Sequence, residues 1–221
     1  MNAKFTLPVL LTILIAACLS CQNSIMIKDE YKPIYTVDLS QSDKRSLPID
    51  FLILRGDFMA HKLGPEYALY LNPNEGDGNI MFGPEITSDF MLSCEVFSGQ
   101  LGEIYPRFAV GTNGLSGLQL RVIPNKDQAE LQLVLNNSYL VAKAPITWND
   151  KAWTSIKLRV LKDGENYRLS GKAWPTKQTE PDWLIDYTGK VKLDKGQCSL
   201  WGWPTSKKDT FFQKIIISIP E

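Results

Sequence analysis

The sequence predicts an all-β protein, folded as a two-sheet antiparallel β-sandwich of the jelly-roll type. Three observations predict it: apolar and polar residues alternate with period two from Ile34 to the end, turn residues recur between the alternating segments, and no segment has a helical period. Many short strands with evenly spaced turns and no helices are typical of sandwiches and jelly rolls.

The strands are expected where alternation would place apolar side chains on one face and polar ones on the other. Such half-buried strands are predicted at residues 118–122, 131–135, 156–160 and 167–171. The connections carry residues that favour tight turns. These turn signals are Asn113-Gly114, residues 124–127, Asn136-Asn137 and residues 162–165.

Length and charge limit the function classes. The chain has 221 residues, with no internal repeat and no low-complexity linker, so we expect one folded domain over residues 31–221. Its 24 basic and 24 acidic residues balance. A neutral chain without basic runs lacks the electrostatic footprint of a nucleic-acid-binding protein.

The N-terminus has the plan of a secretion signal. Lys4 precedes an apolar run over residues 5–15, which is shorter than the roughly 20 residues that a membrane-spanning helix needs. The run ends in Ile15-Ala16-Ala17-Cys18, which resembles the lipobox of bacterial lipoproteins, where the cysteine is lipidated and the preceding peptide removed. We therefore expect a signal peptide over residues 1–18, a tether over 19–30, and lipid anchoring in the cell envelope, on the periplasmic face or the cell surface.

Two alternatives remain open at this end of the chain. Leu19-Ser20-Cys21 also reads as the end of a lipobox, although Cys18 then occupies a position where an aliphatic residue is usual. An ordinary cleaved secretion signal that contains two cysteines is the other alternative.

Two cysteines lie within the predicted domain, Cys94 and Cys198. Both alternate with apolar residues, so we expect buried thiols in preference to a Cys94–Cys198 disulfide, which would need α-carbons within about 7 Å of each other. A zinc site lacks ligands, because His61 is the only histidine.

A set of core and turn landmarks lies at residues 78–84, 88–92, 118–122, Trp148 and 153–160. This set resembles the concanavalin A-like lectin/glucanase superfamily. Further landmarks lie at residues 171–174, 180–183 and 215–219. They are similar to jelly-roll modules appended to β-propeller proteins of bacterial envelopes and, more loosely, to the 3-keto-disaccharide hydrolase family. The resemblance implies a jelly-roll fold more strongly than any activity.

Strand alternation places several aromatic and polar side chains on outward positions. Aromatic side chains are usually buried for packing, so outward ones require an explanation. A pyranose ring has an apolar face that stacks on indole, and its hydroxyls hydrogen-bond to polar side chains, so a carbohydrate on the concave sheet is one such explanation. The alternative is a second core layer, with the tryptophans covered by residues 30–74. Trp148 and Trp153 are assigned to core and turn. The candidate ligand-binding residues are Trp201, Trp203, Trp174, Glu95, Tyr105, Arg107 and Arg121.

Catalysis is a further alternative. Retaining glycosidases need two carboxyl groups about 5 Å apart, and no strand here carries the alternating carboxylates of the related glucanases. Glu95 is alone on its strand, and His61 is not accompanied by a nucleophile-elbow sequence. We therefore assign no catalytic residue, and only the hydrolase resemblance keeps Glu95 as a candidate for hydrolysis of a 3-keto-glycoside.

One glycine-rich loop, residues 72–79, gathers oxygen ligands of the kind that calcium prefers. Sandwiches of the resembled superfamily often carry such an ion, although polar glycine turns are mostly plain hairpins. No other cofactor is expected. The candidate calcium ligands are Asn72, Asn74, Glu75 and Asp77.

The functional expectation is an envelope module that binds a carbohydrate or another envelope component. The competing class is a structural or assembly module without a small ligand, whose exposed aromatic residues dock a protein such as a β-propeller subunit. A pocket with convergent polar groups would favour the first class, and a flat apolar patch the second.

Overall fold

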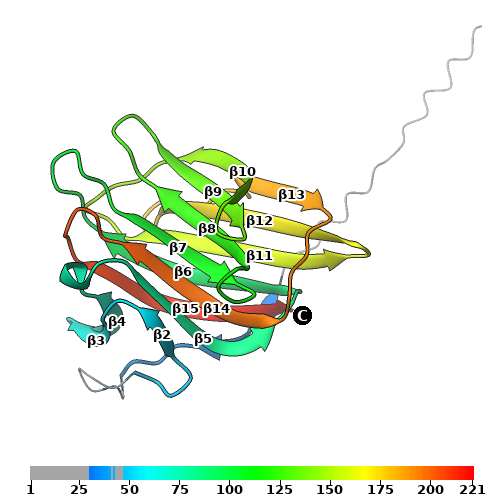
Figure 1. The fold of residues 1–221 in the computed structure, drawn as a ribbon, viewed down its shortest axis with the longest axis horizontal. Helices are drawn as coiled ribbons and strands as arrows, with labels where there is room; N and C mark the ends of the chain where they lie inside the picture. Colours follow the sequence, from blue (N-terminus) through cyan, green and yellow to red (C-terminus); the bar gives the residue numbers. More distant parts are fainter. Residues whose placement is uncertain (1–29, 41, 43–46) are drawn as a thin grey trace, which may run out of the picture.

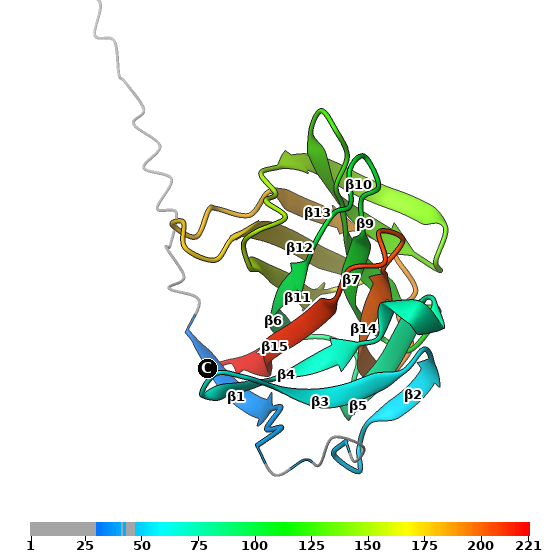
Figure 2. The ribbon, with the colours of Figure 1, turned by 90° about the vertical axis from the view of Figure 1, so that its left-hand side faces the viewer.

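Alternation along the sequence becomes inside–outside alternation in the computed structural model, which describes residues 30–40, 42 and 47–221. Strand β6 (Phe90–Ser98) shows it most clearly, since every second residue from Phe90 to Ser98 is buried and the residues between them are partly exposed. The described chain forms two antiparallel sheets that pack face to face, as Figures 1 and 2 show. The predicted all-β sandwich is therefore confirmed.

One sheet of the described chain has eight strands, and all its pairings are antiparallel. Strand β15 (Thr210–Pro220) lies near its middle. Strand β4 (Glu66–Leu71) pairs with the first residues of β15, and β1 (Tyr31–Thr36) pairs with the last. In spatial order the sheet contains β13 (Ile185–Gly189), β12 (Asn166–Pro175), β11 (Thr154–Asp163), β6, β15 (Thr210–Pro220), β4 (Glu66–Leu71) and β3 (Phe58–Leu63), with β1 (Tyr31–Thr36) beside β15.

The second sheet of the described residues has seven strands, also antiparallel. Strand β14 (Gly196–Trp203), late in the sequence, lies between β7 (Arg107–Thr112) and β5 (Gly78–Ile86). In spatial order it contains β10 (Tyr139–Ile146), β9 (Ala129–Leu135), β8 (Leu118–Ile123), β7 (Arg107–Thr112), β14 (Gly196–Trp203), β5 (Gly78–Ile86) and β2 (Leu52–Arg55).

The core fills the space between the sheets with inward-facing residues of both. Phe90 and Phe212 enter it from the eight-stranded sheet, and Phe82 and Phe108 from the seven-stranded sheet; none has measurable exposure. Such large apolar side chains supply most of the burial that stabilises a sandwich.

Turns lie where the asparagine and glycine signals predicted them. Asn136 and Asn137, between β9 and β10, both have positive φ angles, of 51° and 62°, as a tight hairpin turn requires. Asn113 has a φ of 61°, and its side-chain amide donates to the carbonyl oxygens of Ile86, Thr87 and Asp194. Asn113 therefore ties three separate connections together.

The two cysteines of the domain are free and buried, one in each sheet. Burial raises the pKa of the Cys198 thiol to about 12, and burial likewise raises the pKa of Cys94 well above its usual range. Both thiols are buried in strands, as their alternation with apolar residues predicts.

The two ends of the described chain meet at one corner of the sandwich. The backbone N–H of Glu221 donates to the carbonyl oxygen of Glu30, and β1 lies beside the C-terminus in Figure 2. Cys18 and Cys21 lie outside the described residues. Within the described part of the chain, no helix has the length and apolar character needed to cross a membrane.

Candidate functional site

A hollow of about 380 Å³ opens on the outer face of the seven-stranded sheet. Its volume lies within the range of pockets that bind small molecules. It is formed by the last residues of β14, the outward side chains of β7 and β8, and the β9–β10 turn. The residues that line it are Trp201, Trp203, Arg107, Arg121, Ile123 and Asn137.

The two tryptophans form an aromatic wall of this hollow. Trp201 and Trp203 are two residues apart on β14, so both point outward, and their rings lie nearly parallel, with centroids 5.8 Å apart and 15° between the planes. The indole N–H of Trp201 donates to the hydroxyl of Ser199 at 2.9 Å, which fixes the ring's orientation. Both side chains are half-buried.

The described residues of the early segment do not line the hollow. They form β1, β3 and β4 in the eight-stranded sheet and β2 at the edge of the seven-stranded sheet. The described part of residues 30–74 therefore does not close this hollow, and Trp201 and Trp203 stay partly exposed instead of forming a second core layer.

Arg121 faces the tryptophans across β7. The register places Trp201 and Arg121 on either side of Ala109, whose small side chain lets them close over the strand. The guanidinium carbon of Arg121 lies 5.6 Å from the centroid of the Trp203 ring, within the range of a cation–π contact.

Hydrogen bonds hold the Arg121 guanidinium in place. Its Nε donates to Gln119 Oε1 at 2.8 Å, and Nη2 donates to the carbonyl oxygen of Asn137 at 2.9 Å. Gln119 in turn donates from Nε2 to Asn137 Oδ1 at 2.6 Å. Burial, and then the charge of Arg107, lower the pKa of Arg121 from its usual value.

Arg107, in contrast, is exposed at the start of β7, opposite Trp203 in the register. Within the described residues its guanidinium makes no hydrogen bond or ion pair. The hollow thus combines one guanidinium that is held by hydrogen bonds with one that is not.

Glu95 and Trp174 lie elsewhere, so the expectation that all the candidate residues share one sheet is wrong. They occupy the outer face of the eight-stranded sheet, in a row that runs from Trp174 through Ser155 to Glu95. There they line a separate hollow of about 310 Å³. Outward alternation identified the exposed face of each strand, but the sequence does not reveal which sheet a strand joins.

The β12–β13 connection covers part of that face. The Trp183 ring lies over the Arg159 guanidinium and the Lys172 ammonium, each 4.4 Å from its centroid. Trp174, expected to be exposed, is only 9% exposed, because the same connection folds beside it. Glu95 accepts a hydrogen bond from Gln213 at 2.8 Å.

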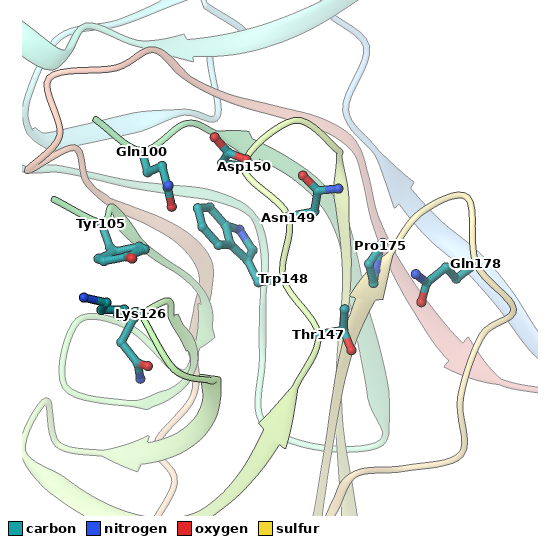
Figure 3. Close-up of a pocket in the computed structure, with 10 residues that line it drawn as sticks. Gln100, Tyr105, Lys126, Thr147, Trp148, Asn149, Asp150, Pro175 and Gln178 are labelled. Atoms are coloured by element: carbon teal, nitrogen blue, oxygen red, sulfur yellow. The ribbon is translucent and has the colours of Figure 1, made fainter. Parts of the chain in front are cut away.

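Tyr105 belongs to a third site, a polar pocket of about 410 Å³ among the loops at one end of the sandwich. Figure 3 shows Trp148 in its middle, between Tyr105 and Lys126 on one side and Pro175 and Gln178 on the other. The rings of Tyr105 and Trp148 meet edge to face, with centroids 6.4 Å apart.

The interpretation of Trp148 as only a core or turn residue missed this pocket. The indole does pack against the core, but it also lines the opening, together with Asn149 and Asp150 of the same loop. The run Trp148-Asn149-Asp150 in a predicted turn was the available signal. Trp153 is half-buried just before β11 and packs against Phe97, an outward-facing residue of β6, with ring centroids 5.7 Å apart, so it is not part of the core between the sheets.

The glycine-rich loop forms a short 3₁₀ turn, Pro73–Glu75. Asn72 caps it, accepting from the backbone N–H of Asn74 at 3.1 Å and donating to Asp57 at 3.2 Å. One of the four candidate calcium ligands is thus engaged in the turn itself. Among the residues that the structure describes, no group of three or more His, Cys, Asp or Glu side chains is placed to hold a metal ion.

Three other carboxylates of the described strands and loops are engaged in ion pairs. The pairs are Glu103 with Lys126 at 2.9 Å, Glu130 with Lys143 at 2.8 Å, and Asp186 with Arg168 at 2.6 Å.

His61 is an exposed residue of β3. Its ring lies beside those of Tyr70 and Phe211, with ring centroids 5.7 and 5.5 Å away.

Comparison with solved structures identifies the fold. A legume lectin-like domain from Entamoeba histolytica has a TM-score of 0.56 at 8% identity, covering 85% of this chain and 99% of that one. The exoplasmic/lumenal domain of VIP36, in a Ca²⁺/Man-bound form, has a TM-score of 0.56 at 14% identity, covering 87% and 92%. The carbohydrate-binding module CBM66 from Bacillus subtilis has a TM-score of 0.50 at 13% identity, covering 76% and 94%.

These neighbours establish a concanavalin A-like jelly roll, and at such low identity they establish the fold alone. No protein-family model and no curated protein matches the chain.

Proposed function

We propose that this protein is a lipid-anchored module of the bacterial cell envelope that binds carbohydrate in the hollow of Trp201, Trp203, Arg107 and Arg121. The observation that carries the proposal is the pair of half-buried, nearly parallel indoles beside two guanidinium groups on an open sheet face.

The chemistry of this hollow suits a sugar ring. A pyranose presents C–H groups on one face and hydroxyls around its edge, so it needs an apolar wall with polar groups nearby. The tryptophans supply the wall, and Arg107, Arg121 and Asn137 supply hydrogen-bond donors at its rim. A hollow with convergent polar groups also favours a small ligand over a flat protein partner.

The comparisons support the same proposal at a coarser level. The neighbours' own descriptions are those of a carbohydrate-binding module, a legume lectin-like domain and a mannose-bound form of VIP36. The proposal of an envelope location depends on the N-terminal signal and on Cys18 as the lipidated residue.

Titration of the purified full-length protein with a panel of oligosaccharides tests carbohydrate binding, followed by tryptophan fluorescence and calorimetry. Trp201→Ala should weaken binding by about 2 kcal/mol, roughly 30-fold in Kd, because it removes a central aromatic contact. Trp183→Ala is the matched control, since Trp183 is also half-buried but lies on the outer face of the other sheet.

The control variant should bind as the unaltered protein does. A panel that produces neither heat nor a fluorescence change would contradict the proposed function. So would equal losses of affinity in the two tryptophan variants, because the binding site would then not be this hollow.

A further inference from the structure

The charge of the hollow is one-sided. Arg107 and Arg121 both line it, and none of the residues that line it carries a carboxylate. Glu130, which lies beside Ile123 in the register, is engaged elsewhere: it pairs with Lys143 at 2.8 Å and accepts from Gln132 at 2.9 Å. The whole chain is neutral, so the positive charge of the hollow comes from the position of its two arginines and not from an excess of basic residues.

The hydrogen-bonding capacity of the hollow is one-sided too. Asn137 has two acceptor oxygens, but Oδ1 accepts from Gln119 and the backbone oxygen accepts from Arg121. Arginine and indole N–H groups are donors only. The lining residues therefore offer mainly N–H donors, because each of the two Asn137 oxygens already accepts one hydrogen bond, whereas sugar hydroxyls also need acceptors for their own hydrogens.

A ligand that accepts hydrogen bonds and carries negative charge fits both observations. We infer that the hollow selects an acidic saccharide, a hexuronic acid whose carboxylate meets Arg107 while its ring packs against Trp201 and Trp203. This inference rests on the proposed function and names its ligand class.

The two arginines would act differently. A planar guanidinium can hold a carboxylate through two parallel N–H···O bonds, which is the geometry available to the unengaged Arg107. Arg121 already uses Nε and Nη2 on Gln119 and Asn137, so it contributes a fixed positive charge beside the ring of Trp203.

The test compares each acidic oligosaccharide with its own neutral counterpart. Oligomers of galacturonate, glucuronate and mannuronate are titrated into the full-length protein by calorimetry, each beside the same oligomer after its carboxyl groups have been reduced to alcohols. At least one acidic oligomer should bind about 10- to 100-fold more tightly than its reduced form, as expected for charge-assisted hydrogen bonds. Added salt should weaken the acidic form selectively.

Variants assign the preference to a residue. Arg107→Gln should bring the ratio of acidic to neutral affinity close to one, while Trp201→Ala should weaken binding of both forms. Lys62→Gln is the control: it removes one positive charge from β3, in the other sheet, and should keep the ratio. Thermal melting checks that the variants fold.

The outcomes separate the two proposals. Equal affinity for acidic and reduced oligomers, with both lost in Trp201→Ala, would overturn the acidic preference and leave the sugar site intact. An unchanged ratio in Arg107→Gln, or binding of sulfated sugars without any uronate, would also overturn it. Failure of every oligosaccharide, neutral or acidic, would overturn both.

Discussion

Gln119 holds Arg121 and Asn137 of the candidate site in place, and its removal provides a quantitative test. The side chain lies on β8, on the same face as Arg121, and is only 2% exposed. It accepts a hydrogen bond from Arg121 at 2.8 Å and donates one to Asn137 at 2.6 Å. Gln119→Ala removes both bonds and leaves the Arg121 guanidinium without one of its two anchors.

The magnitude follows from the groups involved. The bond to a charged donor contributes about 1.5–3 kcal/mol and the amide–amide bond about 0.5–1.5 kcal/mol. Both values belong at the low end, because Arg121 is half-buried and Asn137 is exposed, so water replaces part of what is lost. With some buried methylene surface also lost, we expect Gln119→Ala to lower the free energy of unfolding by about 2–3 kcal/mol.

Urea denaturation followed by tryptophan fluorescence and circular dichroism measures this change. The melting temperature should fall by roughly 5–10 °C for a domain of this size. Gln132→Ala is the control. Gln132 neighbours Arg121 in the register, and its side chain makes one hydrogen bond, to Glu130. This variant should therefore lower the free energy of unfolding by less than about 1 kcal/mol. Equal changes in the two variants, or less than about 0.5 kcal/mol for Gln119→Ala, would refute the reasoning.

Two further predictions concern acid stability and anchoring. Hydrogen bonds from Arg168 hold the pKa of Asp186 below its usual range, against the opposing effect of burial. The stability that the Asp186 carboxylate contributes is thus complete above its unfolded pKa of about 4, and it is lost as the pH falls through the pKa of the folded state. The free energy of unfolding of Asp186→Asn should therefore depend less steeply on pH between about 5 and 2 than that of the unaltered protein. Identical pH profiles would contradict this. Metabolic labelling with a radioactive fatty acid should be lost in Cys18→Ser and retained in Cys21→Ser, and the reverse pattern would move the anchor to Cys21.

The fold was largely predictable because alternation reports burial directly. The segments predicted at residues 118–122 and 131–135 are β8 and β9, with apolar side chains such as Leu120 and Leu133 buried in the core. The hairpin turn at Asn136-Asn137 was predictable for a local reason as well, since asparagine tolerates positive φ angles.

The site was only partly predictable. Alternation correctly places Trp201 and Trp203 on one outward face, because two residues on one strand share a side. It groups Glu95 and Trp174 with them as well, although these face outward from the opposite sheet. The burial of Trp174 beside the β12–β13 connection also required the structure, since it depends on a loop contact between separate segments.

The sequence by itself determined which residues of each strand face the core and where the chain turns. It is also the basis of the expectation of a secreted, anchored protein. These are local properties, set by the two-residue period of a strand and by the preferences of turn residues. Only the tertiary structure decided which strands are neighbours. Strand order depends on pairing across long stretches of chain, and that pairing places β14 beside β7 and brings the tryptophans to the arginines.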